Sequence, residues 1–267
     1  MKRAAILGSP ISHSLSPILH RRAYEILDIE AQYDAVEVPS GALSEFLKNV
    51  NQTNSTEWLG FSLTMPLKEE VLSLVDEIDV LAKRISSANT LIPFAPRKWR
   101  AYSTDVAGFI WALTANEVMN FKTVTIIGGG GTARAAAAAV DAPGRIIRVV
   151  NRSKHREAQM QGSINDSDLE FIQWGGAKLD SDLVINTTPK SVADNLPAGR
   201  GVLFEALYNP WPTELAKKWP GQVIDGLELL IHQAIDQIAL MTGKSLNRTD
   251  FSKELRRVGL LKLEADR

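Results

Sequence analysis

Residues 121–134, FKTVTIIGGGGTAR, decide the fold of this chain. Residues 124–128 form an apolar run rich in β-branched side chains that stops at glycine, which predicts a buried strand. Small residues follow in the pattern Gly128-x-Gly130-x-x-Ala133 and lead into an alanine-rich helix. Such a turn lets backbone approach a pyrophosphate, and the helix start offers it free N–H groups. We therefore predict a Rossmann-like domain whose cofactor contacts include Gly128, Gly129, Gly130, Gly131, Thr132 and Ala133.

The residues after the next expected strand, 145–150, indicate which dinucleotide binds. NAD-binding proteins usually place Asp or Glu there, to bond the ribose 2′-hydroxyl. This chain instead has Asn151-Arg152-Ser153-Lys154-His155-Arg156, with three cations and no carboxylate. Guanidinium groups bind phosphate through charge-assisted hydrogen bonds, so we expect Asn151, Arg152, Ser153 and Arg156 to hold the 2′-phosphate of NADP. The alternative is that this run is only the solvated basic start of a helix.

Composition excludes several classes of protein. The chain has 267 residues, 45% of them hydrophobic and 23% charged, which is typical of a globular protein with room for two domains. A net charge of −1 favours neither a nucleic acid nor a membrane surface as partner. Cysteine is absent and the four histidines are scattered, so we expect no disulfide and no metal. The apolar run near the N-terminus, AAIL, is too short for a signal peptide, so we expect a cytoplasmic protein.

The first hundred residues alternate strand and helix patterns, which predicts an α/β domain. Strands are expected at 3–8, 33–38 and 58–65, and paired strands at 88–94 and 100–103 around a turn at 96–98. Helices are expected after Ser16-Pro17, from Ser40 and from Pro66.

The nucleotide domain should follow a helix that begins at Asp105. Its strands are expected near 123–127, 145–150, 181–186, 202–207 and 222–225. A long helix, 227–241, should end at Gly243, and a last one, 251–261, should return to the first domain. We therefore predict an α/β protein with a substrate-binding domain, 1–104 plus 238–267, and an NADP-binding domain, 105–237. The active site should lie between them, beyond the carboxyl ends of the strands.

Polar groups at strand ends are the candidates for chemistry. Ser14 and Ser16 lie two residues apart before a helix, where they suit a carboxylate ligand, although Ser16 could simply cap the helix. Lys68 falls in the first turn of the helix opened by Pro66, a poor place for an ordinary cation, which hints at proton transfer. Asp105 could cap its helix or pair with Lys68.

Eight stretches, in this order, resemble the shikimate dehydrogenase family. They are GSPISHSLSP (8–17), SLTMPLK (62–68), SANTL (87–91), STDVAGF (103–109), GGGGTAR (128–134), NRS (151–153), YNPWPTEL (208–215) and LIHQA (230–234). The resemblance implies a small α/β substrate domain joined to a Rossmann-like NADP domain. It also implies NADPH-dependent, reversible reduction of 3-dehydroshikimate to shikimate, in the biosynthesis of chorismate and aromatic amino acids. By resemblance, Lys68 and Asp105 are the catalytic pair, and the substrate is bound by Ser14, Ser16, Thr64, Asn89, Tyr208 and Gln233.

Some positions depart from the family pattern. Ser62 and Ser103 stand where the family usually has Asn, Glu205 where it has Asp, and residues 190–192 lack the customary Gly-Met. Ser62 and Ser103 are expected to flank the substrate pocket. One alternative is therefore a quinate or quinate/shikimate dehydrogenase using NAD or NADP, and another is a non-catalytic nucleotide-binding regulator. We expect a monomer or homodimer.

Overall fold

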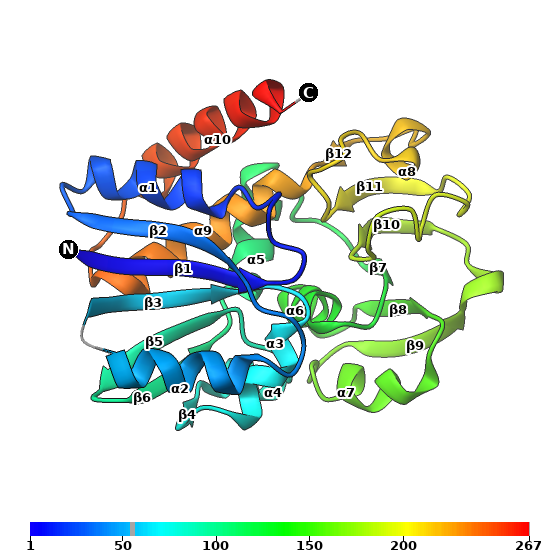
Figure 1. Cartoon of the computed structure of the whole chain (residues 1–267). Helices are drawn as coiled ribbons and strands as arrows, with labels where there is room; N and C mark the ends of the chain where they lie inside the picture. The colour runs from blue at the N-terminus through cyan, green and yellow to red at the C-terminus, as the bar shows by residue number, and fades with distance from the viewer. Residues whose placement is uncertain (54–56, 267) are drawn as a thin grey trace. The chain divides into compact units, whose positions relative to one another are not determined.

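The computed structural model describes residues 1–53 and 57–266 of the chain. The chain divides into two compact units, and each is built from strands and helices (Figure 1). Unit 1 contains Met1–Thr104 together with Ile231–Arg267, and unit 2 contains Asp105–Leu230. The predicted α/β class, with C-terminal helices that return to the first domain, is confirmed.

The sheet of unit 1 has the strand order β2-β1-β3-β5-β6-β4. β1 pairs in parallel with β2 and β3, whereas β5 runs antiparallel to both β3 and β6. The predicted hairpin is therefore confirmed. The strands are β1 (Lys2–Gly8), β2 (Ala31–Glu37), β3 (Trp58–Leu63), β4 (Glu77–Ile78), β5 (Thr90–Ala95) and β6 (Lys98–Tyr102).

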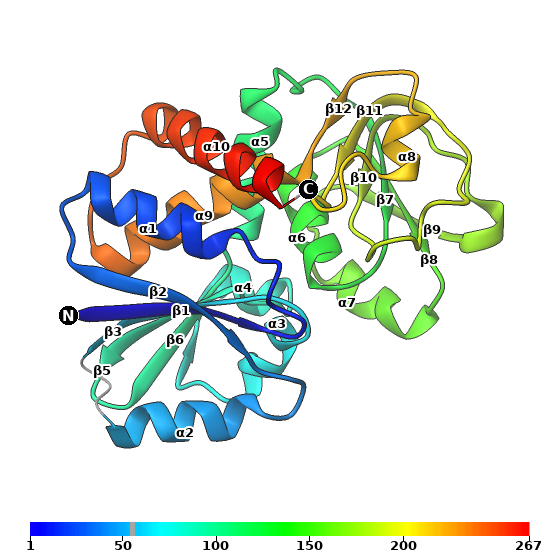
Figure 2. The same ribbon diagram turned by 45° about the horizontal axis from the view of Figure 1, so that its top comes forward.

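Helices cover both faces of this sheet (Figures 1 and 2). One face carries α2 (Leu43–Thr53), α3 (Leu67–Glu70), the short 3-10 helix η2 (Val71–Ser73) and α4 (Val80–Arg84). The other face carries α1 (Ser16–Ile26), α9 (Gly226–Thr242) and α10 (Arg248–Ala265), with α1 and α10 side by side. Alternate strand residues point to opposite faces. Phe61 and Leu63 accordingly join the apolar core beneath α2, while Ser62 points to the other side.

The sheet of unit 2 has the order β12-β11-β10-β7-β8-β9, and its neighbouring strands pair in parallel. The order reverses between β7 and β10, as in a doubly wound dinucleotide-binding fold. The predicted Rossmann-like domain is confirmed. Its strands are β7 (Thr123–Ile127), β8 (Ile146–Asn151), β9 (Asp168–Gln173), β10 (Asp180–Asn186), β11 (Arg200–Glu205) and β12 (Val223–Ile224).

Strand β9 does not appear among the strands expected from the sequence. It is an edge strand, and its side chains are at most half-buried, so its apolar residues form no continuous run. The alternation of Leu169 and Phe171 with Asp168 and Glu170 was the available signal.

Helices α5 (Asp105–Ala115) and α6 (Gly131–Val140) lie against each other in unit 2. Its remaining elements are α7 (Glu157–Gln161), α8 (Glu214–Lys217), and the 3-10 helices η3 (Lys154–Arg156) and η4 (Trp174–Gly176). The expected end of α9 is confirmed, because Gly243 adopts φ +67° and its N–H donates to the Ala239 carbonyl.

Candidate functional site

In unit 1, two of the predicted motifs meet where the neighbouring parallel strands β1 and β3 have their carboxyl ends. The parallel strands β1 and β3 end there, and the Thr64 N–H donates to the Leu7 carbonyl at 2.9 Å. The Ser9 N–H donates to the Met65 carbonyl at 3.0 Å. Gly8 is required at this crossing, since a Cβ there would overlap the Thr64 side chain. The serine loop after β1 and the segment from Thr64 to Lys68 therefore start side by side.

The two serines of the first motif lie at the start of α1. Ser16 is the first residue of α1 and is 1% exposed, and the cap residue Leu15 provides no side-chain bond. The hydroxyl of Ser14 instead accepts the N–H of Ser16 at 3.2 Å. The alternative that Ser16 caps the helix is therefore wrong, because Ser14 bonds the free N–H at the helix start. Ligand binding by both serines stays a prediction.

Lys68 lies in α3, which is only four residues long. So short a helix aligns too few peptide dipoles to disfavour a cation at its start, so this argument from the sequence loses its force. The backbone carbonyl of Lys68 accepts the N–H of Ala88 at 2.8 Å. This bond fixes α3 beside the segment that carries Asn89.

Asn89 is the centre of a buried polar cluster in unit 1. Its side chain is 1% exposed, and its Oδ1 accepts the N–H of Thr104 at 2.8 Å. Its Nδ2 donates to Thr104 Oγ1 at 2.9 Å and to Gln233 Oε1 at 3.1 Å. The structure thus brings two predicted substrate ligands, Asn89 and Gln233, into direct contact.

A second glutamine of α9, missed by the sequence analysis, lies beneath this cluster. Gln237 is 1% exposed, and its Nε2 donates to the Asn89 carbonyl at 2.9 Å and to Thr90 Oγ1 at 3.1 Å. Its position four residues after Gln233 places it on the same helix face, which was the available signal.

Ser62, one of the departures from the family pattern, belongs to the same buried network. Its hydroxyl donates to Gln237 Oε1 at 2.8 Å and accepts from the Tyr33 hydroxyl at 2.6 Å. Because Ser62 is 0% exposed and these two partners occupy its hydroxyl, we assign it to the core.

His20 packs beside this network on α1. Its ring stacks on Tyr33 with centroids 4.0 Å apart, and its side chain is fully buried. Burial lowers the pKa of His20 from 6.5 to about 3. His20 is therefore neutral near pH 7.

Two predicted site residues belong to unit 2. Asp105 is the first residue of α5, directly follows Thr104 in the chain, and is 4% exposed. Tyr208 is half-buried after the end of β11. The pairing of Lys68 with Asp105 stays a prediction.

The glycine turn of unit 2 has the openness that a pyrophosphate needs. Gly128 adopts φ +116°, which only glycine tolerates well. Gly130 precedes α6, and apart from its chain neighbours no described atom lies within 4 Å of the position of a Cβ there. A Cβ on Gly129, in contrast, would lie 2.9 Å from Asn151 Nδ2 and 3.4 Å from Arg156 Cβ. The structure therefore places Asn151 and Arg156 against the turn.

Two arginines have distinct places near this turn. Arg134 is fully buried and its Nη1 donates to the Gly129 carbonyl at 3.1 Å, which holds the turn from within. Arg152 is exposed, and its guanidinium lies 5.2 Å from the centre of the Trp174 ring. Asn151 Nδ2 donates to the Ser153 carbonyl at 2.8 Å, and this bond orders the backbone of residues 151–153. These residues can hold a dinucleotide that carries an extra phosphate beside Arg152.

Glu205, another departure from the family pattern, is fully buried at the end of β11. Asn186 Nδ2 donates to both of its carboxyl oxygens, at 3.0 and 2.9 Å, and the Thr213 hydroxyl donates at 2.9 Å. Burial raises the pKa of Glu205 despite these bonds. Its carboxyl group joins the end of β10 to the start of α8.

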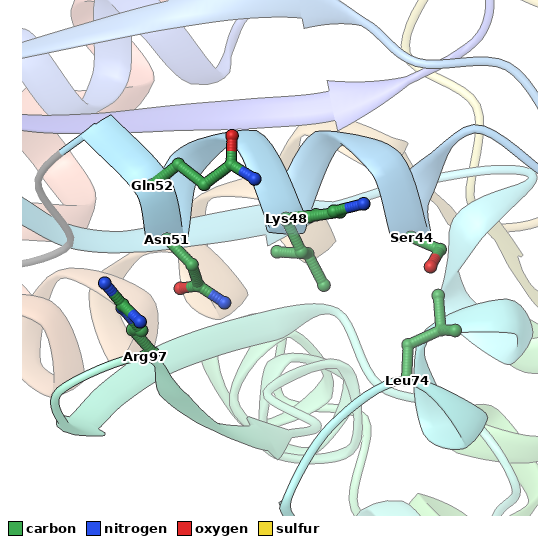
Figure 3. A pocket seen from close by; sticks show the side chains of 7 residues that line it. Ser44, Lys48, Asn51, Gln52, Leu74 and Arg97 are labelled. Atoms are coloured by element: carbon green, nitrogen blue, oxygen red, sulfur yellow. The ribbon is translucent and has the colours of Figure 1, made fainter.

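A surface pocket of about 370 Å³ lies along α2, and none of the predicted site residues lines it (Figure 3). Among residues 1–53 and 57–266, no group of His, Cys, Asp and Glu side chains is arranged to hold a metal ion. Within the same residues, no helix has the length and apolar composition needed to cross a bilayer.

Comparison with known proteins identifies relatives that match most of the chain. The family model of the shikimate dehydrogenase substrate binding domain matches residues 6–91. A shikimate dehydrogenase (NADP(+)) of Prochlorococcus marinus strain AS9601 is 31% identical, and the match covers 89% of this chain and 91% of the relative.

Solved structures agree with these matches. Shikimate dehydrogenase of Mycobacterium tuberculosis is 33% identical with a TM-score of 0.80, over 96% of this chain and 100% of that one. The enzyme of Thermus thermophilus, solved with NADP(H) and shikimate, is 30% identical with a TM-score of 0.82, over 96% of this chain and 99% of that one. The chain belongs to the shikimate dehydrogenase family.

Proposed function

We propose that this protein is an NADP-dependent shikimate dehydrogenase, which reversibly reduces 3-dehydroshikimate to shikimate. The observation that carries the proposal is the gathering of separate motifs at one edge of the unit 1 sheet. Segments 8–17, 62–68 and 87–91 are joined there by backbone hydrogen bonds, and Gln233 contacts Asn89 directly. Relatives that match along most of this chain are named as enzymes of this activity.

The cofactor assignment rests on the residues around the glycine turn of unit 2. The open position at Gly130 and the start of α6 suit a pyrophosphate. Asn151, Arg152, Ser153 and Arg156 provide hydrogen-bond donors and positive charge for a 2′-phosphate, and this segment offers no carboxylate for a free 2′-hydroxyl. The four residues therefore favour NADP over NAD.

Lys68 and Asp105 carry the proton chemistry in this proposal. When bound, NADPH supplies the hydride to the carbonyl carbon of 3-dehydroshikimate. The Lys68 ammonium stabilises the negative charge that develops on the carbonyl oxygen and then donates a proton to it. Asp105 orients the lysine and shares its proton in the reverse direction. Ser14 and Ser16 bind the carboxylate of the substrate, and Thr64, Asn89, Tyr208 and Gln233 bind its hydroxyl groups.

A two-by-two assay tests the proposal. Purified protein is given shikimate or quinate with NADP⁺ or NAD⁺, and the appearance of the reduced cofactor is followed by absorbance. The expected result is the highest kcat/KM for shikimate with NADP⁺. A higher kcat/KM for quinate would favour the quinate dehydrogenase alternative. Tight NADP⁺ binding without turnover of either acid would favour the non-catalytic regulator.

The partners of the protein in this proposal are small molecules. A cytoplasmic location and a monomeric or homodimeric state stay predictions from the sequence, and size-exclusion chromatography with light scattering measures the latter.

A further inference from the structure

We propose that Trp174 is a positioning residue for the cofactor: its indole ring holds the Arg152 guanidinium ready to bind the 2′-phosphate of NADP. This inference rests on the proposed function, because it concerns the phosphate that distinguishes NADP from NAD. Trp174 lies outside the motifs that resemble the family, in the short helix η4 after the edge strand β9.

The Arg152 guanidinium lies over the ring of Trp174. The Arg152 guanidinium carbon lies 5.2 Å from the centre of the Trp174 ring, within the range of a cation–π contact. Trp174 is half-buried and packs against the apolar core of unit 2, so its ring is a fixed platform. Arg152 is exposed and follows β8, whose last residue, Asn151, lies against Gly129 of the glycine turn.

The chemistry of this contact leaves the arginine available for a ligand. A cation–π contact acts through the charge of the guanidinium, so it leaves the N–H donors of the arginine for a ligand. Within the described residues, no hydrogen bond and no ion pair engages the Arg152 guanidinium. An arginine held over the ring loses less side-chain entropy when phosphate binds, because part of its rotamer freedom is already restricted.

Titration calorimetry with NADP⁺ and NAD⁺ tests the proposal without requiring turnover. Trp174→Leu keeps apolar volume in the core but removes the aromatic face, and Trp174→Met serves the same purpose if leucine unfolds the protein. We expect either variant to raise the Kd for NADP⁺ about two- to fivefold, the size of an exposed cation–π contact, and to leave the Kd for NAD⁺ unchanged. Trp174→Phe keeps an aromatic face and should restore most of the affinity.

Two controls separate positioning from loss of structure. In the Arg152→Ala background, Trp174→Leu should have no further effect on NADP⁺ binding, because the residue it acts through is gone. Phe94→Ala removes a comparable ring in unit 1, under Arg100 at 5.0 Å, and should change neither Kd.

The possible results also separate this inference from the proposed function. Equal affinity of the unaltered protein for NADP⁺ and NAD⁺ would overturn the assignment of NADP itself. If the unaltered protein prefers NADP⁺ while Trp174→Leu weakens both cofactors equally or neither, the role of Trp174 is overturned and the NADP assignment stands.

Discussion

The side-chain amide of Gln237 donates to the backbone carbonyl of Asn89 at 2.9 Å, across 148 positions of sequence. Gln237 also holds Thr90 and Ser62, so a single side chain of α9 ties together β3 and the start of β5. Asn89, one of the predicted substrate ligands, is therefore fixed from both its side chain and its backbone.

Gln237→Leu should destabilise the protein. The leucine fills similar space but leaves the Asn89 carbonyl and the Ser62 and Thr90 hydroxyls with fewer partners in a buried site, so we expect a loss of about 2–4 kcal/mol. Urea unfolding measures it. Gln222→Leu is the matched control, since Gln222 is exposed and its amide donates to the Asn116 carbonyl at the surface. Equal stability of the two variants would contradict the buried network.

His20 should make the protein sensitive to acid. Its pKa is about 3 in the folded state, below its ordinary value of 6.5, so the unfolded chain binds the additional proton. Stability is thus fully present above about pH 6.5 and falls as the pH approaches 3, by up to about 1.4 kcal/mol per pH unit. His20→Phe keeps the ring on Tyr33 and should flatten this contribution. Urea unfolding of both proteins between pH 4 and pH 7 checks it, and parallel stability curves would show that His20 does not titrate on unfolding.

Lys68→Ala should lower kcat by about 10²–10⁴, the usual contribution of a positioned acid or base. The Kd for NADP⁺ should not change, because the lysine acts on the substrate. Stopped-flow and steady-state kinetics measure the first quantity and calorimetry the second. Lys83→Ala, an exposed lysine of α4, is the control. Undiminished turnover in the Lys68 variant would end its assignment as the proton donor.

Gly129→Ala and Gly130→Ala should both weaken NADP⁺ binding, but for different reasons. A Cβ on Gly129 meets Asn151 at 2.9 Å, so that variant should lose stability as well as NADP⁺ affinity. A Cβ on Gly130 would have no described atom within 4 Å except those of its chain neighbours, so that variant should keep its Tm. It should lose affinity only, because the added methyl blocks the pyrophosphate. Gly162→Ala, with ordinary contacts at 3.6 Å, is the control for both. Normal NADP⁺ binding by Gly130→Ala would place the pyrophosphate elsewhere.

Arg152→Ala should weaken NADP⁺ binding by about 1.5–3 kcal/mol, the scale of a hydrogen bond to a charged group, and should spare NAD⁺. Competition binding against both cofactors measures the difference. An equal loss for the two would mean that Arg152 contacts a part of the cofactor that they share.

The sequence allowed the fold class to be predicted because its signals were local. The apolar run before Gly128 and the cap at Gly243 depend only on neighbouring residues, and both are confirmed. The edge strand β9 was missed because its side chains are at most half-buried and form no continuous apolar run. Ser16 does not cap α1, because the hydroxyl that accepts its N–H belongs to Ser14. The spacing of Gln237 from Gln233 showed only a shared helix face, and nothing local marked Trp174, since the importance of both residues arises from partners that are distant in sequence.

Unit 1 is discontinuous in sequence, and this has a consequence for synthesis on the ribosome. The sheet of β1–β6 emerges early, yet residues 231–267, which hold most of α9 and all of α10 and cover one of its faces, are translated after all of unit 2. Until then the face that carries Ser62 and Thr90 has no Gln237 to bond. Domains generally fold as units while the chain grows, so unit 2 can finish folding first although it begins later. On the ribosome, unit 2 can therefore reach its folded state before unit 1, although unit 1 contains the first residues of the chain.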